Sequence, residues 1–185
     1  MKNKSPLMRT ISMSLLALMM LFIGACFHES EVIIKNNSAA EAWVEVNGKD
    51  QYAIRPGGST RLTYPSPRTL DIRYWGHHIL PGTIALDMNL AGGDHLSLEP
   101  NCGAIRFHNS SSLEMRELRL SPAGQNNWSV NLLPTFLSTG DHIHISRAPG
   151  TYDVKIRDQH NNYFYASSRT VNMDETTNYI FTGLN

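Results

Sequence analysis

One-by-one alternation of apolar and polar residues runs through several short segments, and it constrains the fold more than any other feature. YDVKIRD (152–158) shows it clearly, with apolar side chains at Tyr152, Val154 and Ile156 and charged ones between them. Successive side chains of a strand point to opposite faces, so this pattern predicts a strand with one buried face and one solvated face. TLDIRY (69–74) repeats it. Turn residues separate such segments roughly every 8 to 12 residues, the spacing of a β-sandwich or barrel.

The chain after its first 26 residues can be written as two related halves. Four pairs of segments correspond in order: VIIKNNSAAEAWVEV with AIRFHNSSSLEMRELRL, IRPGGSTRLTY with LSTGDHIHI, PRTLDIRYWG with PGTYDVKIRD, and GTIALDMNLAGGDHLSL with SRTVNMDETTNYIFTGL. No window of roughly 11 residues in this part has the 3.6-residue period of an amphipathic helix. SLEMRELRL (112–120), which changes phase once, is interpreted as a bulged strand. We therefore predict an all-β chain with two tandem antiparallel β-sandwich-like modules, at 31–100 and 101–185.

The first 25 residues have the pattern of a secretory signal peptide. The basic residues at its start are Lys2, Lys4 and Arg9. An uncharged apolar run of 15 residues follows, from Ile11 to Ala25, which is shorter than the ~20 residues that a transmembrane helix needs. A basic start, a short apolar middle and small residues at the end are the three parts of a signal peptide. We predict that residues 1–25 are removed and that residues 26–30 form a short tether.

Ile23-Gly24-Ala25-Cys26 resembles the lipobox of bacterial lipoproteins. In that family the cysteine is acylated, with palmitate among its lipids, and becomes the new N-terminus, so the resemblance implies a lipid anchor at Cys26. Several chains hold a protein on a membrane, because each buried CH₂ contributes roughly 0.8 kcal/mol. Phe27 stands where an aspartate would resemble the inner-membrane retention signal of enteric bacteria, which favours the outer membrane. The alternative is an uncleaved or ordinarily cleaved signal in which Cys26 is incidental.

Charge and cysteine content restrict the remaining chain. Removal of residues 1–25 would take three of the 16 basic residues and none of the 16 acidic ones, leaving a formal charge of −3. Without a basic cluster, this charge gives no footprint for nucleic acid. An acylated Cys26 would leave Cys102 as the second and last cysteine, so no intramolecular disulfide is expected. Cys102 is then either buried as a small apolar group or available to a partner.

Two segments of the second half resemble known extracellular β-domains. APGTYDVKIRD (148–158) resembles the turn and strand of many secreted immunoglobulin-like and transthyretin-like β-sandwich domains. NNWSVNLLP, followed by LSTG and that strand, is similar to an uncharacterised bacterial extracellular β-domain family. The resemblance covers residues 104–160 best and implies a fold without implying a task, since such folds carry many functions.

The sequence contains none of the common catalytic motifs. It has no G-x-S-x-G elbow, H-E-x-x-H pair, phosphate-binding loop or paired C-x-x-C. The serines stand mainly in polar turns and the acidic residues are dispersed. We therefore predict no catalytic residues and no cofactor.

His142 and His144 are the strongest candidates for metal ligation. They alternate on one predicted strand, so both imidazoles leave the same face, and imidazole is a common ligand of zinc, copper and nickel. Ile143 and Ile145 would take the core face, which places the histidines on the solvated face. No third ligand is evident, so no metal site is predicted. The adjacent pair 77–78 follows a glycine and is expected in a loop.

Two surface contacts are candidates for binding a partner. GQNNWSVNLLP (124–134) has no counterpart in the first half and carries a dense apolar set. It is interpreted as a plug that closes the end of the sandwich. The alternative is an aromatic platform in which Trp128 binds a glycan or protein, with Asn127 as donor and acceptor. Trp75 is expected on the outer face of its strand, where core packing does not explain a tryptophan.

These features predict a non-catalytic lipoprotein of the bacterial cell envelope that acts as a protein-binding accessory or assembly module. A surface-exposed glycan-binding or adhesion module is the alternative, followed by a metal-binding protein that uses His142 and His144. About five residues separate Cys26 from the first expected strand near Val32, and at ~3.5 Å each they reach under roughly 20 Å. The partner is therefore expected to lie close to the membrane that holds the lipid.

Overall fold

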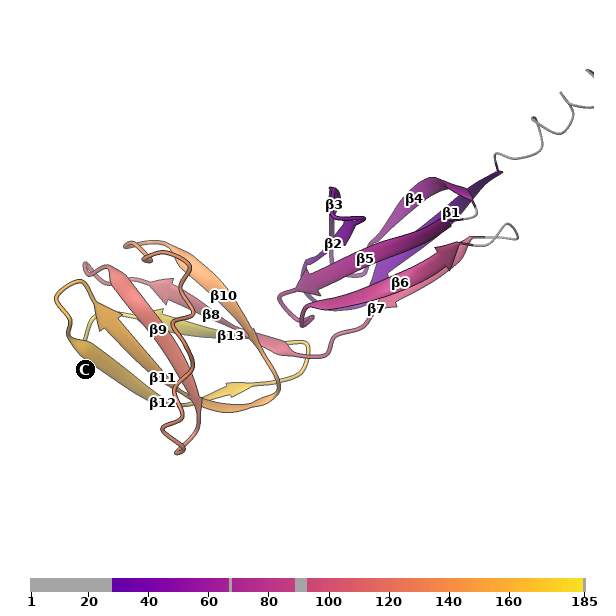
Figure 1. The fold of residues 1–185 in the computed structure, drawn as a ribbon. Helices are drawn as coiled ribbons and strands as arrows, with labels where there is room; N and C mark the ends of the chain where they lie inside the picture. Colours follow the sequence, from indigo (N-terminus) through magenta and orange to yellow (C-terminus); the bar gives the residue numbers. More distant parts are fainter. Residues whose placement is uncertain (1–27, 67, 89–92, 185) are drawn as a thin grey trace, which may run out of the picture.

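The computed structural model describes residues 28–66, 68–88 and 93–184, which form thirteen strands and no helix (Figure 1). The all-β prediction is therefore confirmed. Cys26 and the predicted signal peptide lie outside the described residues. Within the described part of the chain, no helix is long and apolar enough to cross a membrane.

The N-terminal half consists of seven strands in two sheets. They are β1 (His28–Asn36), β2 (Ala42–Val46), β3 (Asp50–Ile54), β4 (Ser59–Ser66), β5 (Arg68–Gly76), β6 (Gly82–Met88) and β7 (Asp94–Leu98). The sheet orders are β4-β1-β7 and β3-β2-β5-β6. Their inward side chains, among them Val32, Val44 and Ile72, form one apolar core, as expected for a sandwich whose strands each bury alternate residues.

The C-terminal half consists of six strands in two sheets. They are β8 (Gly103–Asn109), β9 (Met115–Pro122), β10 (His142–Arg147), β11 (Gly150–Asp158), β12 (Tyr163–Val171) and β13 (Thr176–Phe181). The sheet orders are β10-β8-β13 and β12-β11-β9. Val154 and Ile156 of β11 are buried as the alternation predicts. The register of β9 against β11 shifts by one residue at Arg157–Asp158, which confirms the bulged strand predicted there.

Each half also contains one parallel strand pair that the antiparallel prediction did not include. β1 pairs antiparallel with β4 and parallel with β7, and β8 pairs in the same way with β10 and β13. The reason is topological: the last strand of each half returns to lie beside its first strand, in the same direction. Alternation reports which face of a strand is buried and carries no information on strand direction.

A buried asparagine network shows the repeat at the level of atoms. Asn36 ends β1 and Asn109 ends β8, and both are fully buried. Asn36 Nδ2 donates to the carbonyls of Ala40 and Ile54, and Asn109 Nδ2 donates to those of Leu113 and Leu137. Each side-chain oxygen accepts from the backbone N–H and hydroxyl of the serine two residues on, Ser38 or Ser111. Both halves therefore close their first turn with the same four hydrogen bonds, built on the triplets Asn36-Asn37-Ser38 and Asn109-Ser110-Ser111.

Candidate functional site: an aromatic and cationic face

The segment 124–134 covers the outer edge of β9. The backbone N–H groups of Ser129 and Leu132 donate to the carbonyls of Leu120 (2.9 Å) and Leu118 (2.8 Å). Leu132 packs against the core and Leu133 is buried within it. An uncovered edge strand offers free backbone groups to other chains, so this part of the segment protects the edge of β9, whereas the prediction had it closing the end of the sandwich.

Trp128 directly precedes the residues that pair with β9, and its side chain belongs to a cluster of rings around Lys155. Its ring lies 6.1 Å from that of Tyr165 in an edge-on arrangement, at an interplanar angle of 62°. The Lys155 ammonium lies 4.5 Å from the ring centroid of Tyr163, 5.8 Å from that of Trp128 and 5.9 Å from that of Tyr165. Tyr163 and Tyr165 are 44% and 62% exposed. Three rings and one ammonium group thus share a surface formed by β11, β12 and the segment 124–134.

Charged neighbours extend this surface across the sheet. Lys155 lies opposite Arg119, and Arg157 lies opposite Glu117, between β11 and β9. Glu117 forms ion pairs with Arg119 (2.7 Å) and Arg157 (3.3 Å). The Glu117 carboxylate is therefore shared by two guanidinium groups, and Lys155 lies beside them on the same face. We call the set formed by Glu117, Arg119, Trp128, Lys155, Arg157, Tyr163 and Tyr165 the aromatic–cationic face.

The sequence contained a signal for this face that was not used. Tyr163, Phe164 and Tyr165 follow one another on β12, and alternation places Phe164 in the core and both tyrosines outside. Two exposed tyrosines two residues apart have no packing reason to be aromatic. The prediction named only Trp128 because the pairing of β12 with β11, which brings Lys155 between the rings, is a tertiary fact. Asn127 is exposed, and its backbone N–H donates to Ser121 Oγ (2.8 Å).

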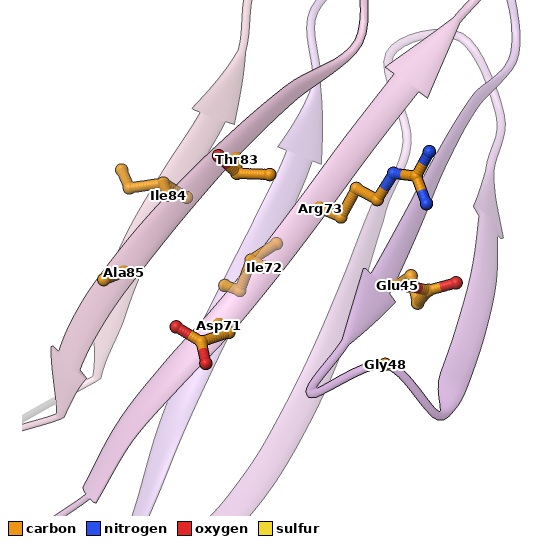
Figure 2. Close-up of a pocket in the computed structure, with 8 residues that line it drawn as sticks. All are labelled: Glu45, Gly48, Asp71, Ile72, Arg73, Thr83, Ile84 and Ala85. Atoms are coloured by element: carbon orange, nitrogen blue, oxygen red, sulfur yellow. The ribbon is translucent and has the colours of Figure 1, made fainter.

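Trp75 lies on the outer face of β5, as predicted, but its side chain is half-buried and not fully exposed. Trp43 of β2 lies directly opposite it, and the Arg73 guanidinium lies 5.6 Å from the centre of its ring. A shallow depression of about 380 Å³ lies farther along the same face, lined by Glu45, Asp71 and Arg73 among others (Figure 2). Acidic and basic side chains lie side by side around this depression, so its charge favours no one class of ligand and we assign none to it.

His142 and His144 lie on the outer face of β10, as predicted, while Ile145 is buried beneath. Their rings meet edge to face, with centroids 5.6 Å apart. His144 stacks instead on His77 of the other half, at 4.1 Å. Among the described residues, no group of three or more histidine, cysteine, aspartate or glutamate side chains is arranged to hold a metal ion. We therefore assign no metal to these histidines.

Cys102 is buried in the short connection between the halves and forms no disulfide with any residue that the structure describes. Its Sγ lies 3.8 Å from the carbonyl oxygen of His77. Burial raises the pKa of this thiol, and the nearby Asp174 carboxylate acts in the same direction. A buried thiol that is held protonated is a poor nucleophile, so Cys102 has the structural role of a small apolar group.

Comparisons with known proteins give structural neighbours only. No protein-family model and no curated protein matches the sequence. Similar solved structures include the Bacillus anthracis TIE protein, with 12% identity and a TM-score of 0.32 over 83% of this chain and 34% of that chain. A DUF3823 family protein from Bacteroides ovatus has 10% identity and a TM-score of 0.29, over 77% of this chain and 98% of that chain. The tip fimbrial protein Mfa3 from Porphyromonas gingivalis has 7% identity and a TM-score of 0.27, over 76% and 81%. The chain thus spans about a third of the length of the TIE protein chain.

Proposed function

We propose that the protein is a non-catalytic lipoprotein of the bacterial cell envelope that binds a protein partner through its aromatic–cationic face. In this proposal residues 1–25 are a signal peptide, residues 26–30 tether the chain through acylated Cys26, and the modules at 31–100 and 101–185 form the body. The observation that carries the binding role is the cluster of Trp128, Tyr163 and Tyr165 around Lys155.

The residue types of this face support a protein partner. Tryptophan, tyrosine and arginine are the residues that most often dominate the energy of protein interfaces. The exposed tyrosines supply contact area at little entropic cost, because each has only two side-chain torsions. Three cations against the single carboxylate of Glu117 make the face net positive, which fits an acidic surface on the partner.

The ring geometry supports a protein more than a sugar. A sugar stacks its C–H groups on an open, flat ring face, whereas Trp128 and Tyr165 meet at 62°. The Lys155 ammonium already lies over all three rings, within 5.9 Å of each ring centroid. A carboxylate of a protein partner can pair with Lys155 while its apolar groups contact the rings at the side.

Acylation of Cys26 gives the first prediction. Cys26→Ser should abolish incorporation of labelled palmitate and move the protein from the membrane fraction to the soluble periplasmic fraction, because the anchor is lost. Cys102→Ser is the matched control, and it should still incorporate labelled palmitate and remain in the membrane fraction. Palmitate incorporation that persists in Cys26→Ser would contradict the lipid anchor. Density-gradient separation of inner and outer membranes tests the proposed outer-membrane location in the same experiment.

Crosslinking at the aromatic–cationic face gives the second prediction. The photoreactive residue p-benzoylphenylalanine at position 165 should crosslink one envelope protein in living cells, while the same residue at position 180 should not. Ile180 is a matched control because it is 59% exposed and lies on β13, in the other sheet of the same half. Equal crosslinking from both positions, or from neither, would contradict the proposed face.

Affinity for the identified partner then measures the role of the charge. Lys155→Glu should weaken binding at least about 10-fold, because it reverses a charge at the centre of the interface. Lys49→Glu makes the same change on an exposed turn of the N-terminal half and should have no effect. Binding of Lys155→Glu within about 2-fold of the unmodified protein would place the contact elsewhere. Recognition of a glycan array with no protein crosslink would favour the adhesion alternative.

A further inference from the structure

The two halves meet through polar contacts rather than through a shared apolar core. Each of the two core clusters contains residues of one half only. The loop after β5 instead reaches the C-terminal half, where Ser146 Oγ donates to the carbonyls of His77 (2.9 Å) and Gly76 (3.1 Å). Polar contacts of this kind contribute little net free energy each, so the orientation of the halves depends on a small number of residues.

His78 forms the most buried of these contacts, with 3% of its surface exposed. Its Nδ1 lies 3.0 Å from Asp174 Oδ1, and its Nε2 lies 2.8 Å from Thr176 Oγ1. Because a carboxylate only accepts hydrogen bonds, Nδ1 carries the proton and Nε2 accepts from the threonine hydroxyl. Asp174 Oδ1 also accepts from the backbone N–H of Ala39 (2.8 Å). With a second proton on Nε2 the bond to Thr176 would reverse, with Nε2 donating to the hydroxyl oxygen, so both contacts can form in either state of the ring.

The second contact is a stack of two imidazoles, one from each half. The rings of His77 and His144 lie 4.1 Å apart with an interplanar angle of 28°. Trp43 of β2 meets His77 edge to face at 5.1 Å, and His142 meets His144 in the same way at 5.6 Å. Two neutral imidazoles can stack at this distance. If both rings carried a positive charge, they would repel each other.

The charged and titratable groups around the stack oppose its protonation. Burial lowers the pKa of His144 to about 4, and the imidazoles of His77 and His142 and the Arg106 guanidinium act in the same direction. Burial also lowers the pKa of His77; His78 and His142 act in the same direction, and only the Glu41 carboxylate acts against it. Burial and the surrounding groups therefore favour the neutral form of both His77 and His144.

We propose that this junction is a pH-sensitive hinge, in which acidification charges the His77–His144 stack and frees the two halves to reorient about the His78–Asp174 contact. The structure supports it through the stack of two imidazoles, one from each half, next to residues 99–102, the short segment that joins the halves. The hinge would change where the aromatic–cationic face points relative to the N-terminal half, and it does not depend on that face being the binding site.

The direction of the pH effect follows from proton linkage. In the closed arrangement the pKa of His144 is about 4, and in the open arrangement it would rise toward the ordinary 6.5, because His77, His78 and part of the burial are removed while His142 and Arg106 of its own half remain. The closed state binds fewer protons than the open state. Its stability relative to the open state is therefore greatest above pH 6.5 and is lost as the pH falls toward 4. For a pKa that rises the full way to 6.5, the ratio of open to closed molecules at pH 4.5 should exceed that at pH 7.5 about 70-fold from His144 alone.

Residual dipolar couplings of backbone amides in the full chain test this hinge. At pH 7.5 the couplings of residues 28–98 and 103–181 should fit one alignment tensor, because the halves tumble as one body. At pH 4.5 they should require two. His144→Phe and His77→Phe keep a ring in the stack but cannot be charged there, so each should retain a single tensor at pH 4.5. His95→Gln, at an exposed histidine of β7, should respond like the unmodified protein.

The same spectra show whether each variant is folded, so a misfolded variant is recognised at once. One tensor for the unmodified protein at both pH values would overturn the proposal. Two tensors at pH 4.5 in both phenylalanine variants would overturn it as well, since the stack would then not be the sensor. Samples are measured with and without EDTA, and a pH response that occurs only without the chelator would assign the effect to a bound metal and overturn the proposal.

Discussion

Replacement of Asn109 with alanine is expected to lower the free energy of unfolding of the C-terminal half by about 3 kcal/mol or more. The Asn109 carboxamide donates to the carbonyls of Leu113 (2.7 Å) and Leu137 (2.9 Å) and accepts from the N–H and hydroxyl of Ser111 (3.1 and 2.7 Å). Alanine would leave these groups without their partner in a site with no exposed surface. Each buried polar group that loses its partner costs about 1–3 kcal/mol.

Hydrogen exchange followed by mass spectrometry can assign this loss to one half. Peptides from β8 and β13 should exchange faster in Asn109→Ala, while peptides from β1 and β7 should keep their protection. Asn36→Ala should give the mirror-image result, because Asn36 makes the same set of hydrogen bonds in the N-terminal half. Ser110→Ala, at an exposed neighbouring position, should leave both halves unchanged. Unaltered exchange in Asn109→Ala would show that the network contributes little.

The burial pattern of the strands was predictable because it is a local property. Val154 and Ile156 alternate with charged residues, and a strand that buries one face has no other way to place them. The correspondence between the two halves was also visible, since the triplets that begin at Asn36 and Asn109 stand at the same place in each. Burial of both asparagines depends on the strands on either side of them, which only the tertiary structure shows.

The contacts that define the site and the junction depend on pairings between distant segments. Lys155 lies among three rings because β12 lies beside β11 and the segment 124–134 lies along β9. Trp75 is half-buried because Trp43, from a strand about 30 residues earlier, lies opposite it. His78 looks like an ordinary loop residue in the sequence, and its partner Asp174 lies 96 residues away. No periodicity within one segment encodes such a pair.

Gly103→Ala should destabilise the C-terminal half by about 3 kcal/mol or more through a steric clash at the start of β8. A Cβ atom at position 103 would overlap the backbone carbonyl oxygen of Asn172 and would lie 2.9 Å from that of Glu175. The turn between β12 and β13 is therefore packed directly against the glycine, and its carbonyls cannot turn away cheaply. The Glu175 carbonyl accepts a hydrogen bond from Ala104 (2.9 Å) that the shift would also weaken.

Calorimetry provides the measurement for this variant, since a loss of this size in a domain of about 80 residues lowers its unfolding temperature by at least ~10 °C. Gly93→Ala is the matched control. A Cβ atom there would meet nothing closer than the Glu31 carbonyl oxygen at 3.6 Å, an ordinary contact, and its unfolding temperature should stay within about 2 °C. Because Asp174 stands in the displaced turn, Gly103→Ala should also weaken the His78–Asp174 contact that holds the halves together. A variant with the unfolding temperature of the unmodified protein would mean that the turn can move away from β8, and that it does not fix the junction.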